Sequence, residues 1–412
     1  MEELDIPSYF LCPISLEILR DPVTLSTGIT YDRENIEKWL YSSKNNTCPV
    51  TKQVLVETEL TPNHTLRRLI QGWCTLNASY GIERIPTPKP PVDKAQIMKL
   101  VSSGRLPQFQ MMSLQRLKFI AGESDANKKC IEATKGAVEF LAAVVKQNSS
   151  EIKTDSMEDG VESTRACDEA VHILYTLQLS ETSLKALMGK NGEFIESLMR
   201  ILRKGNCQAR AYTVFLLKSI CEVADPVHLV SLKLELFEEL VRVLRDYISQ
   251  HARKAVLQIL IEICPWGRNR IKAIDAGAVP LLVELLLEKL EKRTIEMILV
   301  VLDQLCGCAE GRSELLNHSA GIAIVSKKIL RVSQLASERA VRILYSVSKF
   351  FATSSVLQEM LQVGVVSKLC LVLQVDCTVK TKDKAKEILK LHSRVWKSSP
   401  CIPSFLLSSY PS

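Results

Sequence analysis

The sequence predicts a mostly α-helical chain in which a small α+β domain precedes a long array of helical repeats. The chain has 412 residues, which is room for several domains. Only 16 glycines, 16 prolines and 6% aromatic residues occur in it, while hydrophobic residues make up 46%. This composition favours helices packed through Leu, Val and Ile over a turn-rich sandwich or barrel. A recurring apolar segment and a proline-rich linker also support the prediction.

Four of the seven residues at positions 85–91 are proline, and they predict the boundary between the two parts. Proline has no backbone N–H and a fixed φ, so this stretch cannot lie inside a helix and is expected to run as an extended segment. We therefore expect a first domain over residues 5–79, a linker over 80–93, a repeat domain over 94–400 and a C-terminal tail over 401–412.

The elements of the first domain follow from changes in its residue pattern. Its first half is expected to contain, in order, a loop, a strand, a turn and a second strand, at residues 10–21, 22–25, 27–28 and 29–31. A short amphipathic helix comes next, with one apolar face formed by Ile36, Trp39 and Leu40. A second loop over 48–59 then leads to a capped helix whose apolar side chains are Leu66, Leu69, Ile70 and Trp73.

After the linker, an apolar segment recurs and predicts helical repeats. Its clearest copy begins at Gly277 and reads Gly-Ala-Val-Pro-Leu-Leu-Val-Glu-Leu-Leu-Leu, and related segments begin at residues 136, 192, 234, 321 and 364. From 192 onward the starts are spaced by 42, 43, 44 and 43 residues, a period typical of armadillo and HEAT repeats. Most units are a glycine turn that opens an apolar helix, preceded by stretches with apolar residues at i, i+3 and i+4.

One interval in this array is longer than the others. Gly136 and Gly192 are 56 residues apart, and the excess falls at residues 148–165, where acidic residues occur among Ser and Asn. Such a segment has few apolar side chains to bury, so we expect a disordered acidic insert there.

Two loops of the first domain carry the most informative chemistry. Cys12-Pro13-Ile14-Ser15 and Cys48-Pro49-Val50-Thr51 flank a strand and a helix, as in a cross-braced zinc domain whose loops each supply a C-x₂-C pair. Here the second member of each pair is a hydroxyl residue, which cannot supply the thiolate that a structural zinc needs. We therefore expect no metal and no cofactor, with Cys12 and Cys48 packed as small apolar side chains. The loops would be tied by hydrogen bonds and ion pairs, for which the candidates are Ser15, Glu17, Asp21, Asp32, Arg33, Thr51 and Asn63.

These residues carry a family resemblance. Residues 5–78 resemble a U-box, the zinc-free relative of the RING domain, through the segments 11–15, 21–23, 27–33, 36–40, 48–51 and 62–67. These read Leu-Cys-Pro-Ile-Ser, Asp-Pro-Val, Thr-Gly-Ile-Thr-Tyr-Asp-Arg, Ile-Glu-Lys-Trp-Leu, Cys-Pro-Val-Thr and Pro-Asn-His-Thr-Leu-Arg. With the repeat period, the chain resembles the plant U-box/armadillo ubiquitin ligases, and its short, linker-joined form is similar to the subgroup associated with stress and immune signalling. The implied fold is a small α+β zinc-free U-box followed by an α-solenoid of armadillo-like repeats.

The resemblance implies an activity and its partners. A U-box binds a ubiquitin-charged E2 enzyme and promotes transfer of ubiquitin to a substrate lysine without a covalent intermediate. The implied partners are the E2, ubiquitin and protein substrates on the armadillo surface, and a homodimer is a further expectation because U-boxes often pair. No integral membrane segment and no nucleic acid partner are expected.

Family positions map onto residues of this sequence. Those implied to contact the E2 are Ile14, Leu16, Trp39, Pro49 and Val50, each of which could instead belong to the domain core. Lys52 stands where many relatives place an arginine that bridges the E2 and ubiquitin; lysine keeps the charge but lacks the planar fork. Scaffold positions are Cys12, Pro13, Asp21, Pro22, Asp32, Cys48 and Asn63.

The sequence also allows functions of other classes. The main alternative is a non-catalytic armadillo adaptor whose U-box serves for dimerisation or docking. A ubiquitin-accepting nucleophile at Cys12 or Cys48 is disfavoured because no His or carboxylate is placed to lower the pKa of either thiol. Cys306 and Cys308 lack further ligands at metal spacing. The basic helix at 378–400 has lysines around most of its circumference, which favours a solvated C-terminal cap over a site for nucleic acid or anionic lipid.

The thirteen cysteines do not have the dense spacing of a secreted disulfide scaffold. The N-terminal residues are acidic and lack an apolar core of the kind found in signal peptides, and the longest apolar run is too short to span a membrane. Together these features lead us to expect reduced thiols and a cytoplasmic protein.

Overall fold

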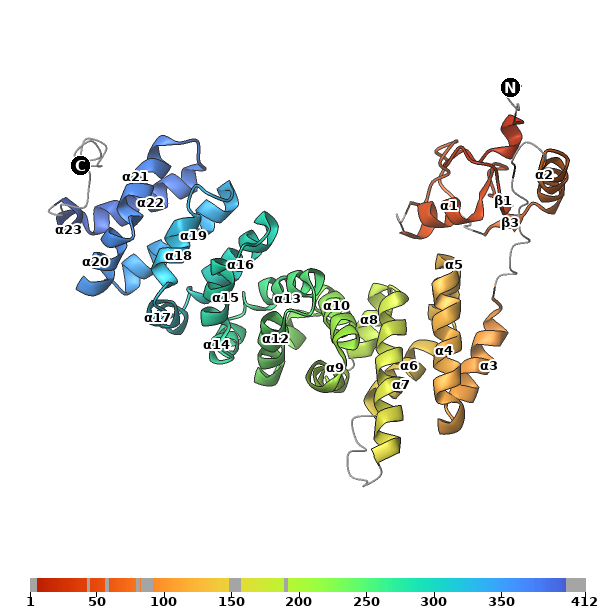
Figure 1. Cartoon of the computed structure of the whole chain (residues 1–412), viewed down its shortest axis with the longest axis horizontal. Coiled ribbons are helices and arrows are strands. Elements are labelled where there is room, and N and C mark those ends of the chain that lie inside the picture. Colours follow the sequence, from red (N-terminus) through yellow and green to blue (C-terminus); the bar gives the residue numbers. More distant parts are fainter. Residues whose placement is uncertain are drawn as a thin grey trace. The chain divides into compact units, whose positions relative to one another are not determined.

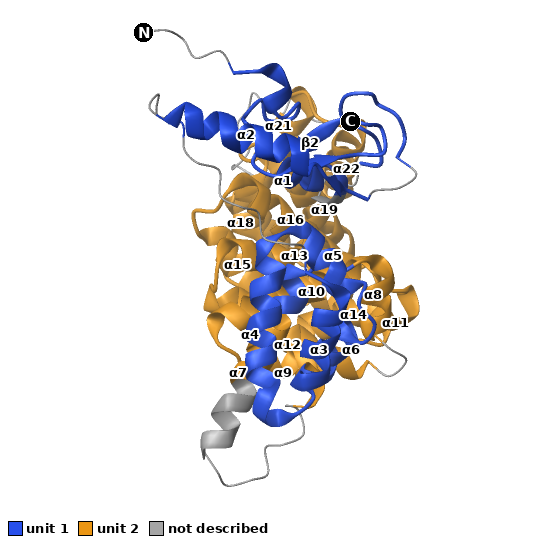
Figure 2. Ribbon diagram, turned by 90° about the vertical axis from the view of Figure 1, so that its right-hand side faces the viewer, with its two compact units in different colours: residues 1–144, 172–179 blue, residues 145–171, 180–412 orange. Residues whose placement is uncertain are grey.

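The computed structural model describes residues 6–42, 45–55, 59–78, 82, 92–147, 157–188 and 192–397. The chain divides into two compact units, each described here by itself (Figure 2). Unit 1 comprises Met1–Val144 and His172–Leu179, and unit 2 comprises Val145–Val171 and Ser180–Ser412. The predicted linker at 80–93 and tail at 401–412 lie mostly or wholly outside the described residues.

Unit 1 begins with the small α+β domain. Its three antiparallel strands pair in the order β2-β1-β3, and their bounds are Pro22–Thr24 for β1, Thr30–Asp32 for β2 and Thr61–Pro62 for β3. The central residue Val23 is fully buried and lies opposite Tyr31 on one side and Pro62 on the other. The third strand is absent from the sequence prediction because two residues are too few to show an alternating pattern.

Short helices close this domain (Figure 1). They are η1 (Ser8–Phe10), α1 (Arg33–Glu37), the π-helical turn η2 (Lys38–Ser42) and α2 (His64–Leu76). Asp32 caps α1 and Asn63 caps α2, because each side chain accepts a hydrogen bond from an amide of the first helical turn. Ile36 and Leu40 are buried as expected, whereas Leu69 is 57% exposed and not part of the core.

The remainder of unit 1 is helical and begins the repeat array. Its elements are α3 (Lys94–Gly104), α4 (Pro107–Glu123), α5 (Asp125–Glu132) and α6 (Ala137–Gln147), the last of which ends in unit 2. Helices α3 and α4 pack along one another, and α4 packs on α5. Ser124 caps α5 by accepting a hydrogen bond from the Asn127 amide at 3.1 Å.

Unit 2 contains the regular repeats, each built from three helices. The helices at the start of the series are α7 (Met157–Thr176), α8 (Glu181–Met188), α9 (Glu193–Lys204) and α10 (Cys207–Val223). The last turn of α7 belongs to unit 1. Two repeats follow as α11 (Pro226–Val230), α12 (Leu234–Asp246), α13 (Gln250–Ile263), α14 (Gly267–Asp275), α15 (Ala278–Leu287) and α16 (Lys292–Leu305). The last helices are α17 (Ala309–Asn317), α18 (Gly321–Lys328), α19 (Gln334–Phe350), α20 (Ser354–Gln362), α21 (Val365–Gln374), α22 (Val379–Leu391) and α23 (Ser393–Lys397).

The third helices of successive repeats stack on one another. Contacts run from α10 to α13, then to α16, α19 and α22, while the second helices α9, α12, α15 and α18 form a parallel series. Four of the third helices begin at a capping side chain that accepts a hydrogen bond from the amide three residues on, at Asn206, Ser249, Ser333 and Thr378. This arrangement confirms the predicted α-solenoid of armadillo-like repeats.

The predicted unit starts coincide with helix starts. Gly136, Gly192, Gly277 and Gly364 all have positive φ, and each stands directly before a helix, which explains why glycine recurs there. Gly321 differs, because it is already the first residue of α18.

Helix α7 extends into the expected acidic insert. The insert was predicted over 148–165, but α7 begins at Met157, and residues 148–156 lie outside the described residues. The prediction of disorder is therefore too long at its C-terminal side. The backbone from Met157 onward is helical, so an acidic composition did not exclude a helix.

The end of the array and the thiols match their expected environments. The predicted basic helix is present as α22 followed by the short α23, and α22 packs on α19 and α21. Every cysteine in the described part of the chain is a free thiol, and among them Cys207 is exposed. No single helix of the described residues is long and apolar enough to cross a membrane, although α20 and α21, bent by 63° at the break between them, meet the length and hydropathy criteria as a pair.

Candidate functional site on two paired loops

The two cysteine loops of the N-terminal domain have the same backbone geometry. In the first, the Cys12 amide donates to the Glu17 carbonyl and the Leu16 amide donates to the Cys12 carbonyl, both at 2.8 Å. In the second, the Cys48 amide donates to the Gln53 carbonyl at 2.8 Å and the Lys52 amide donates to the Cys48 carbonyl at 2.9 Å. Both loops therefore keep the tight turn of a metal-binding loop although neither has a second cysteine.

Each turn closes through a left-handed residue that is not glycine. Leu16 has a φ of 60° and Lys52 a φ of 59°. This conformation costs about 1–2 kcal/mol for a residue with a Cβ. The hydroxyls in place of the missing ligands help to stabilise it, because Ser15 Oγ accepts from the Glu17 amide at 3.4 Å and Thr51 Oγ1 from the Gln53 amide at 3.5 Å.

Cys12 and Cys48 do more than pack as apolar side chains, which corrects the sequence expectation. Cys12 Sγ accepts a hydrogen bond from the Asp32 amide at 3.3 Å, and Cys48 Sγ lies 3.0 Å from the Tyr31 hydroxyl and 3.4 Å from Thr27 Oγ1. Burial raises the pKa of the Cys48 thiol, but hydrogen bonds from the Thr27, Thr51 and Tyr31 hydroxyls outweigh it and bring the pKa to about 6. Burial also raises the pKa of Tyr31, which keeps its hydroxyl a donor.

Complete burial decides the role of these two thiols. Cys12 and Cys48 are both 0% exposed, so neither sulfur can reach a thioester held by another protein. This excludes a ubiquitin-accepting nucleophile at either position and leaves both as acceptors in the scaffold. In the described part of the chain, no group of three or more His, Cys, Asp or Glu side chains is arranged to hold a metal ion.

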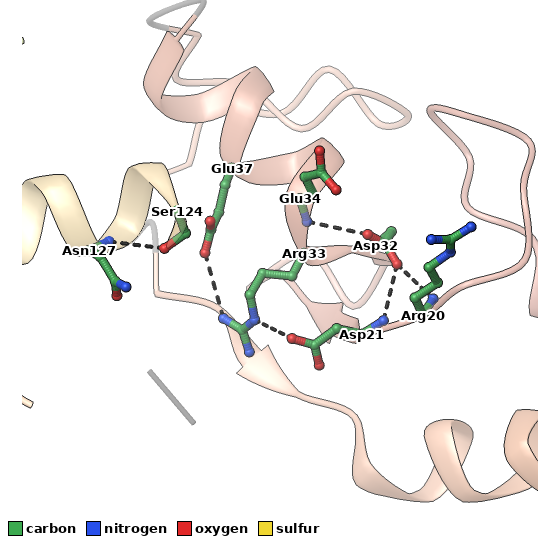
Figure 3. Close-up of polar contacts among 8 residues, drawn as sticks. All are labelled: Arg20, Asp21, Asp32, Arg33, Glu34, Glu37, Ser124 and Asn127. Atoms are coloured by element: carbon green, nitrogen blue, oxygen red, sulfur yellow. Dashed lines mark hydrogen bonds and ion pairs between the residues drawn. The ribbon is translucent and has the colours of Figure 1, made fainter. Parts of the chain in front are cut away.

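Asp32 is the polar centre of the scaffold (Figure 3). Its Oδ2 accepts from the Arg20 amide at 2.7 Å and the Asp21 amide at 3.1 Å, and its Oδ1 accepts from the Glu34 amide at 3.3 Å. Asp21 in turn pairs with Arg33, whose Nε lies 2.6 Å from Asp21 Oδ2. One carboxylate thus joins the first loop, the strand β2 and the start of α1.

Helix α1 and the turn η2 connect the two loops. The Asn35 side chain donates to Ser15 Oγ of the first loop at 3.1 Å, and Trp39 Nε1 donates to the Thr47 carbonyl beside the second loop at 2.7 Å. Lys52 Nζ lies 5.7 Å from the centroid of the Trp39 ring, within cation–π distance. The helix therefore holds both loops in one rigid frame.

Apolar side chains at the loop tips remain exposed in this frame. The exposed fraction is 37% for Ile14, 73% for Leu16 and 51% for Val50. Pro49 and Trp39 are half-buried, so Trp39 contributes both to the core and to the surface. Exposed apolar side chains held on a rigid frame suit a protein-binding surface with an aromatic anchor.

The remaining scaffold positions are distributed as follows. Pro22 is buried in β1, and the Asn63 amide donates to the Pro22 carbonyl at 2.8 Å, which ties α2 to the sheet. Pro13 is exposed and therefore shapes the loop without filling the core.

Sequence reasoning missed Tyr31, Thr27 and Asn35. Tyr31 also accepts from the Val50 amide at 3.3 Å, so it supports the second loop twice. A partial signal was available, because alternation along β2 places Tyr31 on the face opposite Thr30 and Asp32. Which sulfur or hydroxyl it contacts depends on the tertiary fold.

Both parts of the chain match known protein families. Residues 6–79 match the U-box domain, and residues 95–412 match the plant U-box protein ARM repeat region. The chain is 54% identical to E3 ubiquitin-protein ligase PUB22 of Arabidopsis thaliana over 433 aligned residues, which cover 100% of this chain and 99% of that protein. It is 55% identical to E3 ubiquitin-protein ligase PUB23 of the same plant over 416 residues, which cover 100% and 98%.

A solved structure shares the repeat architecture. It is described as "A conserved phosphorylation switch controls the interaction between cadherin and beta-catenin in vitro and in vivo", and it has a TM-score of 0.58 at 15% sequence identity. The likeness covers 86% of this chain and 60% of that one, and at this identity it shows the fold alone.

Proposed function

The chain belongs to the U-box proteins that carry a plant U-box armadillo-repeat region and is an E3 ubiquitin-protein ligase, and on this premise we propose that the two paired loops bind the ubiquitin-charged E2 while the armadillo repeats bind the substrate. The exposed apolar side chains of Ile14, Leu16 and Val50 on the rigid loop frame carry this proposal.

The chemistry that such a ligase performs is positioning. The nucleophile is the substrate lysine and the thioester belongs to the E2, so the U-box needs no acid, base or nucleophile of its own. Bringing a lysine and a thioester into contact converts a bimolecular reaction into an effectively intramolecular one, which lowers the entropic part of the barrier. The complete burial of Cys12 and Cys48 supports this non-covalent route.

For the repeats, the stacked third helices α10, α13, α16, α19 and α22 offer a continuous surface for a protein substrate. We further propose a role in plant stress or immune signalling, supported by the short, linker-joined form, which is similar to the subgroup associated with such signalling. A cytoplasmic location is supported by the free thiols of the described cysteines.

Replacing Ile14 by alanine tests the E2 surface. Ile14 is exposed and outside the core, so the U-box should stay folded while an apolar anchor of the interface is lost. A hot-spot residue contributes about 2 kcal/mol, which predicts a loss of about 30-fold in ubiquitin conjugation. The measurement is autoubiquitination of the full chain with E1, E2 and ubiquitin, together with Trp39→Ala, for which we expect at least an equal loss.

Leu76→Ala is the matched control, because Leu76 is a strongly exposed apolar side chain on α2. It should leave conjugation unchanged. The alternative function, a non-catalytic armadillo adaptor, predicts no conjugation by the unmodified chain. Equal activity of the wild-type, Ile14→Ala and Trp39→Ala chains would instead show that the E2 binds elsewhere.

Lys52 is expected to hold the charged E2 in its reactive arrangement. It is exposed, and its position over Trp39 leaves the ammonium beside the proposed E2 surface. Removing the charge with Lys52→Ala should slow ubiquitin discharge from the E2 about 5-fold, while Lys52→Arg, which adds a bidentate fork, should match or exceed the wild type. Discharge to free lysine measures this step, and unchanged rates in both variants would refute the assignment.

A further inference from the structure

A second polar cluster in unit 1 lies where the U-box meets the first armadillo helices. It surrounds a pocket of 440 Å³ with walls from α1 of the U-box and from the turn between α4 and α5. The side chains that concern the argument are Arg33, Glu37 and Lys38 on one wall and Ser124, Asp125 and Lys128 on the other. The pocket is separate from the tips of the cysteine loops, none of which line it.

Glu37 is the least expected member of this cluster. Its side chain is only 4% exposed, and its Oε1 is buried with no hydrogen-bond donor among the described residues. Arg33 Nη1 lies 3.8 Å from that oxygen, but the Nε of the same arginine is already paired with Asp21 at 2.6 Å. A buried carboxylate with so distant a cation is unfavourable unless another group stabilises its charge or the carboxylate binds a proton.

The start of α5 supplies that group. The Ala126 backbone amide, in the first turn of α5, is near enough to the Glu37 carboxyl to lower its pKa. Ser124, the N-cap residue of α5, accepts from the Asn127 amide, so the buried Glu37 carboxyl of the U-box faces a helix start that already has one side-chain cap. Figure 3 shows Glu37 between Arg33 and Ser124 in this arrangement.

We propose that the U-box docks on the first armadillo helices by placing Glu37 against the N-terminal turn of α5, and that this contact orients the E2-binding loops relative to helices α4 and α5. The docked arrangement leaves Ile14, Leu16 and Val50 exposed, so docking and E2 binding are compatible. The contact is therefore a positioning device for the charged E2 and does not block it. Only this consequence, and not the contact itself, rests on the proposed E2 surface.

The charge state of Glu37 sets the strength of the docking. Burial raises the pKa of Glu37 to about 7; Arg33 and the Ala126 amide oppose the rise, while Asp125 and Asp21 add to it. Lys38, Glu34, Glu123 and Lys128 also line the pocket. Because the docked pKa lies above the usual range of a glutamate, docking is strongest below that range and weakens as the pH rises through about 7.

A charge-swap cycle in the full chain tests the contact. Glu37→Lys places a cation at a helix N-terminus and beside Arg33, and Ala126→Glu places a second carboxylate opposite Glu37 while suiting the first turn of α5. Either single substitution should lower the hydrogen-exchange protection of the amides at 124–128 at least tenfold and increase the radius of gyration measured by X-ray scattering. The double variant should restore both.

Two matched variants complete the design. Glu37→Gln resembles the protonated acid. Its hydrogen-exchange protection at residues 124–128 should therefore be the same at pH 8 as at pH 6, whereas the wild type should lose part of this protection at pH 8. Glu59→Lys, which reverses an exposed acid of the U-box that does not line the pocket, should behave as the wild type. If Glu37→Lys also reduces the protection of β1 and β2, the Ala126→Glu chain, whose U-box is untouched, decides the question.

The proposal would be overturned if both single variants kept wild-type hydrogen-exchange protection at residues 124–128. It would also be overturned if the double variant exchanged as fast as the single variants. Ubiquitin discharge from the E2 to free lysine needs only the loop surface, so Glu37→Lys should leave it unchanged. Failure of that discharge in the wild-type chain would instead refute the proposed function, and the two failures are thereby distinguished.

Discussion

Replacing Asp32 by alanine is expected to destabilise the polar centre of the U-box strongly and to lower ligase activity with it. The Asp32 carboxylate accepts from the amides of Arg20, Asp21 and Glu34, and the Asp32 amide donates to Cys12 Sγ. In a zinc domain the metal would hold these segments together; here one carboxylate performs that task. Alanine would leave three amides without their acceptor and remove the cap of α1.

The free energy of unfolding should fall by about 3 kcal/mol, because hydrogen bonds to a charged group contribute about 1.5–3 kcal/mol each. The total is smaller than three full contributions because the exposed Arg20 and Glu34 amides can form hydrogen bonds with water instead. That is a large part of the stability of a small domain. Hydrogen exchange of the amides in β1 and β2 of the full chain should become about 100-fold faster. Asp32→Asn, which keeps one acceptor oxygen and the cap, should show about half of this free-energy change.

Glu34→Ala is the control, because Glu34 is an exposed acid in the helix that Asp32 caps and its side chain pairs with the exposed Lys38. It should change exchange in the strands by less than about 2-fold. If Asp32→Ala exchanged like Glu34→Ala, the metal-free loops would have to be held by packing alone, and the role given to the carboxylate would be wrong.

The repeats could be predicted from the sequence because their signals are local. Helices α9, α15 and α21 each begin directly after a glycine with positive φ, and such a turn recurs at a fixed period whatever the tertiary structure. Four of the third helices begin at Asn, Ser or Thr caps, which can also be recognised one at a time in the sequence. Local composition predicts disorder up to residue 165, whereas α7 begins at Met157.

In the candidate site, the sequence predicts the kind of interaction that holds the two cysteine loops, because its residue types cannot form a structural zinc site. Two cysteines paired with hydroxyl residues cannot make a structural zinc site, and the structure supplies hydrogen bonds to Cys12 and Cys48 in its place. The identity of those donors was not predictable, because Tyr31 and Cys48 are brought together only by the fold. The left-handed Leu16 is likewise invisible in the sequence, since nothing about a leucine indicates positive φ.

The second large effect is expected at the opposite end of the chain, at Trp396. An armadillo array needs a last element that covers the core face which the next repeat would otherwise cover. Trp396 is 0% exposed, its Nε1 donates to the Ile388 carbonyl of α22 at 3.4 Å, and its ring meets His392 edge to face at 5.8 Å. His392 in turn contacts the Ser348 carbonyl of α19 at 2.8 Å, so the last helices are tied to the repeat before them.

Trp396→Ala should therefore lower the free energy of unfolding of the last helices by about 3–5 kcal/mol, the usual range for removing a fully buried aromatic side chain. Because each repeat contacts only its neighbours, the loss should be confined to the end of the array. Exchange of the amides in α22 should become more than about 100-fold faster while the U-box strands and free-lysine discharge stay at wild-type values. Trp266→Ala, which removes a half-exposed tryptophan before α14, is the matched control and should have a much smaller effect. Equal exchange in the two variants would mean that α23 does not close the core, whereas spread of the effect to the U-box would contradict the nearest-neighbour account of the array.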